Sequence, residues 1–187
     1  MDQQVHITIN DKDEYVVLRN LAILIFVLDS LEKIAVSNSS EIISNLAEDM
    51  LHISYSAFLP LALLQRFQNS GARLVDDVYQ LLKDSSTRTE YSVTWPFAHG
   101  RSLKVTLMKK HWRRLRAIFK RPSKLTSEDA ANIRHSVCLA PLRSDYRDRW
   151  NYKEASPFMR LSRQTFRQDG LLLPFGHPRE SFKEPNP

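Results

Sequence analysis

The chemical feature that dominates the sequence is a run of cations without acids. The 37 residues from Tyr91 to Ser127 contain no Asp and no Glu. They carry ten basic residues: Arg101, Lys104, Lys109, Lys110, Arg113, Arg114, Arg116, Lys120, Arg121 and Lys124. Lysine and arginine neutralise phosphates and release the counterions that surround them. The segment therefore predicts binding to an anionic partner.

Side chains that could support catalysis or metal binding are scattered. His135 and Cys138 lie three residues apart, but two ligands do not make a zinc site. Asp145 and Asp148 could bind a divalent cation, although the arginines beside them favour a salt-bridged surface. The chain has no glycine-rich phosphate loop, no His-Glu-x-x-His pair and no Gly-x-Ser-x-Gly elbow. We therefore expect a protein that is not an enzyme and has no metal and no cofactor.

Charge is distributed unevenly along the 187 residues, whose net charge is +6. Residues 1–90 carry −6, residues 91–127 carry +10 and residues 128–187 carry +2. The hydrophobic fraction of 42% is ordinary for a globular protein. The single cysteine, Cys138, excludes an intramolecular disulfide and favours a reducing compartment. We expect a location in the cytoplasm, or in the nucleus if the source has one.

The hydrophobic pattern predicts an α+β domain, predominantly helical, over residues 1–140. Alternating β-branched residues at 5–9 and an apolar run at 15–18 predict an N-terminal β-hairpin. Apolar periodicity and caps then predict a four-helix core, over about residues 20–36, 38–51, 55–67 and 72–84. Gly71 is expected to separate the last two helices. The apolar runs at 21–28 and 57–64 are too short to span a bilayer, which needs about 20 residues.

A second β-hairpin and a basic helix should position the cations. Strand-like residues at 91–95 and 103–107 predict the hairpin, and Pro122 ends the helix that follows. On this helix Met108, Trp112, Leu115 and Phe119 form one apolar stripe. We expect the stripe to dock on the core and to turn the basic face outward. A further helix is predicted from Thr126 or Ser127 to about Val137.

Three helices followed by a hairpin resemble a winged-helix arrangement. The resemblance implies that the third helix, residues 72–84, enters the major groove of DNA. That helix carries Asp76, Asp77 and Asp84, which repel phosphate. We therefore expect the hairpin and the basic helix to form the contact surface instead.

Residues 141–187 are predicted to form an extended C-terminal arm, since they hold six of the nine prolines. Arginines are interleaved with aromatic residues along the arm. Five apolar residues are candidate partner contacts: Trp150, Phe158, Leu172, Leu173 and Phe175. We expect the arm to dock on its own domain or to become ordered on a partner, and the last ten residues to fray.

The favoured hypothesis is non-catalytic binding of nucleic acid, DNA or RNA, through the basic hairpin and helix 109–121. The ten basic residues would contact phosphate and discriminate little between sequences. The main alternative is a protein-interaction or assembly module whose arm and basic face bind a partner chain or a second copy. A third hypothesis is peripheral binding to an anionic membrane, through Trp112 and Phe119 if the stripe is not buried.

Overall fold

The computed structural model describes residues 11–34, 40–97, 100–120, 126–138, 156–171 and 178–187. Within these ranges the chain is mixed α+β and mostly helical, as predicted, with six α-helices and two small antiparallel sheets. The elements in chain order are α1 (Glu14–Ile34), α2 (Ser40–Tyr55), β1 (Phe58–Pro60), α3 (Leu61–Leu81), β2 (Glu90–Pro96), β3 (Ser102–Met108), α4 (Lys109–Phe119), α5 (Ser127–Cys138), α7 (Pro157–Asp169), a 3₁₀ turn (Arg179–Ser181) and β4 (Phe182–Pro185).

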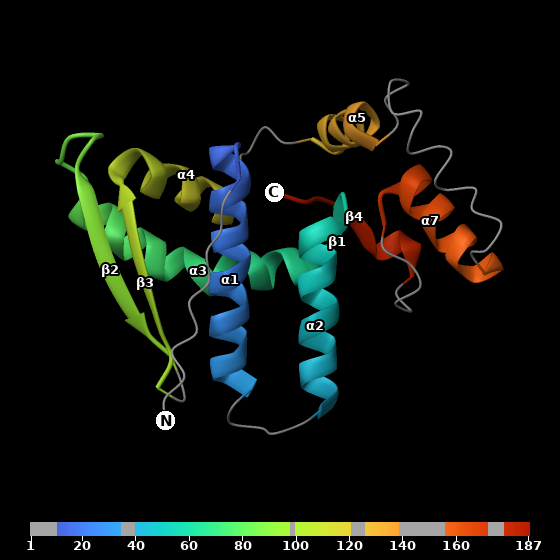
Figure 1. The fold of residues 1–187 in the computed structure, drawn as a ribbon, viewed down its shortest axis with the longest axis horizontal. Coiled ribbons are helices and arrows are strands. Elements are labelled where there is room, and N and C mark those ends of the chain that lie inside the picture. Colours follow the sequence, from blue (N-terminus) through green and yellow to red (C-terminus); the bar gives the residue numbers. More distant parts are fainter. Residues whose placement is uncertain (1–10, 35–39, 98–99, 121–125, 139–155, 172–177) are drawn as a thin grey trace.

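Helix α1 is the centre of the fold, because it packs against α2, α3 and α4. Figure 1 shows α1 and α2 upright and side by side, with α3 crossing behind them. The β2–β3 hairpin and α4 lie on one side of α1, and α7 lies on the far side of α2. One hydrophobic core joins α1, α2, β1, α3, the hairpin and α4. None of the helices in the described ranges is long and apolar enough to cross a membrane.

The start of α1 differs from the prediction. The Asp13 Oδ1 atom accepts a hydrogen bond from the Tyr15 backbone N–H at 2.8 Å, which is the contact of a helix N-cap. The predicted strand at residues 15–18 is therefore wrong, because these residues form the first turn of α1. Its predicted partner strand, residues 5–9, lies outside the described residues. From Leu18 the buried residues follow at helical spacing: Leu18, Ala22, Ile25 and Phe26.

Helix α2 forms where it was predicted, but only some of its apolar side chains are buried. Leu46 and Ile53 are in the core. Ile43 and Met50, which lie at helical spacing from Leu46, are exposed. The apolar side chains of α2 are therefore divided between the core and the surface of the molecule.

Helix α3 is continuous, so the predicted break at Gly71 is wrong. A Cβ atom at Gly71 would lie closer than van der Waals contact to the ring of Phe119 in α4. Glycine is needed there because the ring packs directly on the backbone of α3. Pro60 precedes the helix at the N-cap, where a missing backbone N–H loses no helical hydrogen bond. The two predicted helices are thus one, and three helices precede the hairpin.

The second hairpin is confirmed. Strands β2 and β3 pair antiparallel, with Val93 opposite Val105 and Pro96 opposite Ser102. Gly100 has a φ of 70° in the connection, a conformation that favours glycine. Trp95 faces inward, and its ring lies edge-on to Trp112 of α4 at a centroid distance of 5.9 Å. The hairpin is therefore fixed to α4 through buried aromatic packing.

Two further helices carry clear caps. At α5 the Thr126 Oγ1 atom accepts from the Asp129 N–H at 3.1 Å, and the Asp129 carboxylate accepts from the Thr126 N–H at 2.9 Å. This reciprocal pair is a capping box, and it confirms the predicted helix start. At α7 the Ser156 Oγ atom accepts from the Met159 N–H, and Gly170 ends the helix with a φ of 70°. The predicted extended conformation is therefore wrong for residues 157–169, because these local caps stabilise a helix there.

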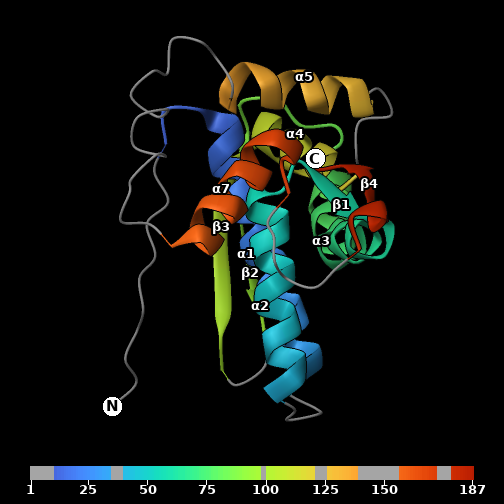
Figure 2. The same ribbon diagram turned by 90° about the vertical axis from the view of Figure 1, so that its right-hand side faces the viewer.

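Residues 178–187 are docked, so the expected fraying of this segment is wrong. Strand β4 pairs antiparallel with β1, with Leu59 opposite Glu184. The Asn186 side-chain amide donates to the carbonyls of Ile53 at 2.9 Å and Ser56 at 2.6 Å. The Arg19 guanidinium donates to the carbonyls of Ile53, Ser54 and Pro187. Figure 2 shows β4 beside β1, close to the upper end of α2. The segment therefore supplies donors to carbonyls that the end of α2 leaves unpaired.

Candidate nucleic-acid interface

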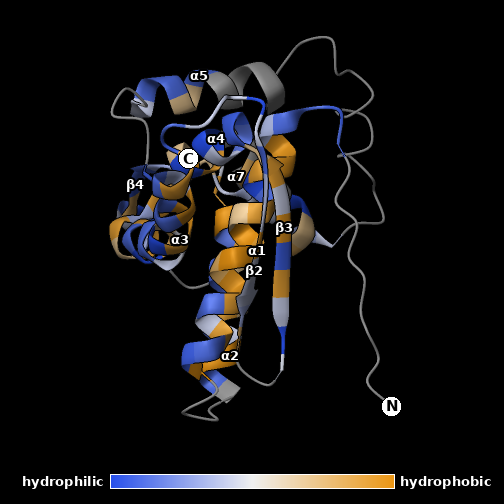
Figure 3. Cartoon of the chain, turned by 90° about the vertical axis from the view of Figure 1, so that its left-hand side faces the viewer, coloured by the Kyte–Doolittle hydropathy of each residue, from blue (hydrophilic) through white to orange (hydrophobic). Residues whose placement is uncertain are grey.

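The candidate surface lies on α4, and the buried side of this helix holds it in place. Trp112, Leu115 and Phe119 are almost fully buried, as the predicted stripe requires, and they pack on α3, α1 and β3. We call the remaining exposed cations the outer strip, defined as Lys110, Arg113, Arg114 and Lys120. Figure 3 shows the hydrophilic colouring of α4 beside apolar stretches of α1.

On the α1 side of the strip, three basic groups meet one carboxylate. The Lys110 Nζ atom lies 3.7 Å from the Glu14 Oε1 atom, and His111 and Arg114 also contact this carboxylate. Burial, and then the positive charge of Lys110, lowers the pKa of the His111 imidazole. At neutral pH the charges around Glu14 are therefore mainly those of Lys110 and Arg114.

On the α3 side, two basic groups meet a second carboxylate. The Lys120 Nζ atom lies 2.7 Å from Asp76 Oδ2, and the Arg116 Nε atom contacts Asp76 Oδ1. The Arg116 guanidinium also lies over the Tyr79 ring, 4.5 Å from its centroid. Burial tends to raise the pKa of Asp76, but the hydrogen bonds from Lys120 and Arg116 outweigh it and lower the pKa. Asp76 is thus an anion that binds α4, rather than a solvated acid on α3.

Lys109 has a structural position. Its Nζ atom donates to the backbone carbonyls of Lys83 and Ser85, at 2.6 Å each. These carbonyls lie just beyond the C-terminal end of α3, where a positive charge is favourable. Lys109 therefore joins α4 to the end of α3 and does not belong to the outer strip.

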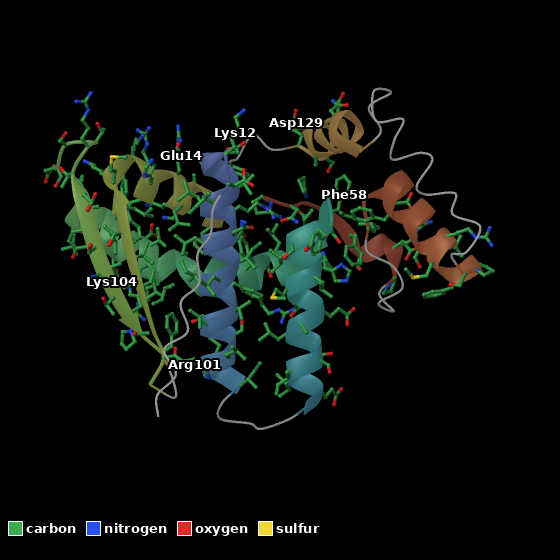
Figure 4. The ribbon with its side chains drawn as sticks, viewed as in Figure 1. Lys12, Glu14, Phe58, Arg101, Lys104 and Asp129 are labelled. Atoms are coloured by element: carbon green, nitrogen blue, oxygen red, sulfur yellow. The ribbon has the colours of Figure 1, made fainter. Side chains whose placement is uncertain are left out.

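The structure separates the hairpin cations from α4. Arg101 precedes β3 and α4 follows it, so that the seven residues of β3 lie between them. At about 3.3 Å per residue this is roughly 20 Å. Figure 4 shows Arg101 at the end of the hairpin that is farther from Glu14, and Lys104 about midway along the hairpin. Lys104 is exposed on the hairpin, but Arg101 lies too far along it to share one small contact surface with α4.

The remaining predicted site residues fall into two groups. Arg121 and Lys124 lie outside the described residues, as do Trp150, Leu172, Leu173 and Phe175. Phe158 is described and is 57% exposed in the first turn of α7, near the exposed residues Met159 and Leu161. The structure therefore places one predicted partner contact on an open surface.

Sequence reasoning did not identify Glu14, and it considered Asp76 as an acid that repels phosphate. Both acids lie far from α4 in the sequence, and the Asp76–Arg116 pair spans 40 residues. The acid-free segment is therefore paired in part by carboxylates from the first half of the chain. Only the excess of acid in residues 1–90 hinted at this pairing, and it could not identify the two residues.

A buried trio at the end of α2 resembles a catalytic arrangement. The His52 Nδ1 atom lies 3.0 Å from Ser56 Oγ, and its Nε2 atom lies 3.7 Å from Glu48 Oε1. His52 and Ser56 are only 1% and 3% exposed, and the Phe182 ring covers His52 at 4.9 Å. In this arrangement the serine is closed to any substrate, and the trio packs the end of α2 against β4.

The described residues contain hollows but no cluster of metal ligands. No group of three or more His, Cys, Asp or Glu side chains among the described residues could hold a metal ion. A hollow of about 400 Å³ lies between the first turn of α1, Arg114, Ile118 and Pro187. A second, of about 460 Å³, lies where α1, α2 and α3 meet and is lined in part by Asp49 and Arg66.

Comparison with known proteins adds no relative: no protein-family model, no curated protein and no solved structure matches this chain.

Proposed function

We propose that this protein binds nucleic acid without catalysis, through phosphate contacts made by the outer strip of α4. The observation that carries the proposal is a row of four exposed cations, three on one rigid helix and Lys120 directly after it, anchored by a ridge that is almost fully buried. A rigid helix fixes the backbone from which these charges project, so less backbone freedom is lost on binding.

The two carboxylates reduce the positive charge of the surface but leave it in excess. Glu14 is shared by Lys110 and Arg114, and Asp76 by Arg116 and Lys120. Each anion thus faces two cations. Arg113 lies on the same exposed side and forms no ion pair with any described residue. A positive surface remains available to a polyanion.

The buried ridge favours nucleic acid over a lipid surface. Insertion of α4 into a bilayer would require Trp112 and Phe119 to leave the core. Such a change would expose several large side chains, each worth about 1.5–3 kcal/mol when buried. In this proposal the outer strip replaces the third helix of the winged-helix arrangement as the contact surface.

The test is a salt titration of binding to labelled single- and double-stranded oligonucleotides, followed by fluorescence anisotropy. Four phosphate contacts predict a slope of log K against log salt of about −4 for duplex and about −3 for single strands. Arg113→Gln should weaken binding and make the slope shallower by about 1, because one contact is lost.

Two variants serve as matched controls for Arg113→Gln. Lys33→Gln removes the same charge at the opposite end of α1 from Glu14, and it should leave the slope unchanged. Lys109→Gln removes a cation from α4 itself. It should lower the free energy of unfolding and leave the slope of log K against log salt nearly unchanged. An equal loss of affinity in Lys33→Gln and Arg113→Gln, or no binding by the wild-type chain, would contradict the proposal.

A second candidate function, a protein-interaction or assembly module, is favoured by the surface of α7. Phe158, Met159 and Leu161 are 57%, 44% and 63% exposed within the first two turns of this helix. Three large apolar side chains exposed close together are typical of a contact surface for another protein.

A further inference from the structure

Four cations, Lys110, Arg114, Arg116 and Lys120, are arranged around two carboxylates, whereas Arg113 forms no ion pair with any described residue. Glu14 comes from α1 and Asp76 from α3, so that one acid lies on each side of α4. Both carboxylates are partly open to water, with exposed fractions of 40% and 30%. A phosphate that binds any of these four cations must therefore displace a carboxylate of the protein from it.

We propose that Glu14 and Asp76 compete with phosphate for the basic side chains of α4 and thereby set the affinity of the surface. This inference rests on the proposed function. An ion pair between exposed groups contributes only about 0–1 kcal/mol. Exchange for a phosphate is therefore feasible, but each pair that is broken reduces the net gain on binding.

The two acids should act differently, because their partners differ in exposure. Arg114 is 53% exposed and Lys110 45% exposed, and both belong to the outer strip. Arg116 is 29% exposed and lies over the Tyr79 ring. Glu14 therefore mainly restrains ligand binding. Asp76 also holds α4 against α3, and its removal should affect stability as well.

The main test is Glu14→Gln, measured with the same labelled duplex at low salt. Glutamine keeps the size of the side chain and removes the charge that Lys110 and Arg114 share. We expect the affinity to rise about fivefold, the effect of releasing two exposed ion pairs of ordinary strength. The slope against salt should also become steeper, because more counterions are released on binding.

Asp77→Asn is the matched control for charge. Asp77 is exposed on α3, is adjacent to Asp76, and forms no ion pair with any described residue. Its substitution changes the net charge by the same amount as Glu14→Gln. We expect it to raise the affinity much less.

A double-mutant cycle separates local exchange from the overall field. In a Lys110→Gln/Arg114→Gln background, Glu14→Gln should no longer raise the affinity, because its partners are gone. A rise that persists in this background would overturn the inference. Thermal melting of each variant shows whether the fold is kept. The test depends on Glu14→Gln and holds even if Asp76→Asn, which removes the Asp76 charge, unfolds the protein.

The outcomes also separate the inference from the function on which it rests. If neither the wild-type chain nor Glu14→Gln binds any oligonucleotide, the proposed function fails. If the wild-type chain binds and Glu14→Gln binds no better than Asp77→Asn, the function stands and the competition by carboxylates is wrong.

Discussion

Gly71 lies in the middle of α3 at the point where the Phe119 ring of α4 reaches the helix backbone. The sequence suggested that this glycine ends a helix, because glycine weakens helices and often follows their last turn. Its actual role is to allow two helices to approach closely. The two roles look the same in a sequence, since the residue that explains the glycine lies 48 positions later.

Substitution of Gly71 separates these two roles. Gly71→Ala should lower the free energy of unfolding by about 1–3 kcal/mol, because the new methyl group overlaps the Phe119 ring. Helix propensity alone predicts the opposite sign, a gain of about 1 kcal/mol. Chemical denaturation measures the difference. In a Phe119→Leu background the loss should shrink, and a stabilised Gly71→Ala would contradict the packing described above.

The cations show a similar limit at the level of single residues. Composition located the basic segment correctly, and periodicity separated its buried stripe from its charged side. Neither could show that Lys109 binds the end of α3 or that Arg116 is held by Asp76. These partners are brought together only by tertiary packing.

Among the elements, those defined by local signals were predicted well. The β2–β3 hairpin and the helices α1, α2, α4 and α5 all occur at or near their predicted positions. Errors arose where two local signals competed. Residues 15–18 have the composition of a strand, but the Asp13 cap and the core contacts of Leu18 make them helical.

The pairing of β4 with β1 has a direct test. Asn186→Ala should lower the free energy of unfolding by about 1–3 kcal/mol, because two partly buried hydrogen bonds, to the carbonyls of Ile53 and Ser56, are lost. Asn186→Asp should cost as much, since a carboxylate cannot donate. Urea denaturation gives the values, and Lys183→Ala, at an exposed position of β4, is the control. Equal effects of Asn186→Ala and Lys183→Ala would show that the amide contacts contribute nothing.

For the molecule as a whole, the uneven distribution of charge along the sequence reflects ion pairing inside the fold as well as an exposed basic surface. The acidic first half and the basic segment pair with each other inside the fold, because Glu14 and Asp76 form ion pairs with cations of α4 and Lys120. The apolar pattern gave the helical class of the fold correctly. It could not give the contact between β1 and β4, because strands so short carry almost no sequence signal.

The exposed face of α7 predicts the outcome of an assembly experiment. If the second candidate function holds, the full chain scatters light as an oligomer, and Phe158→Ser/Leu161→Ser scatters as a monomer, because its contact surface has lost two large apolar groups. Arg160→Ser changes an exposed residue of the same helix and should leave the mass unchanged. The same mass for all three proteins would exclude assembly through α7.

The position of β4 also has a consequence for the order of folding. Leu59 meets Glu184, so β1 acquires its neighbour only after the residues between these two positions have been synthesised. At about 5–20 residues per second this delay is on the order of ten seconds. The contacts between α1 and α2 and between α3 and α4 join segments that are closer in sequence, so they can form earlier. Until β4 has been synthesised, the end of α2 lacks its contacts with β4 and Asn186, so this part of the core stays open during translation.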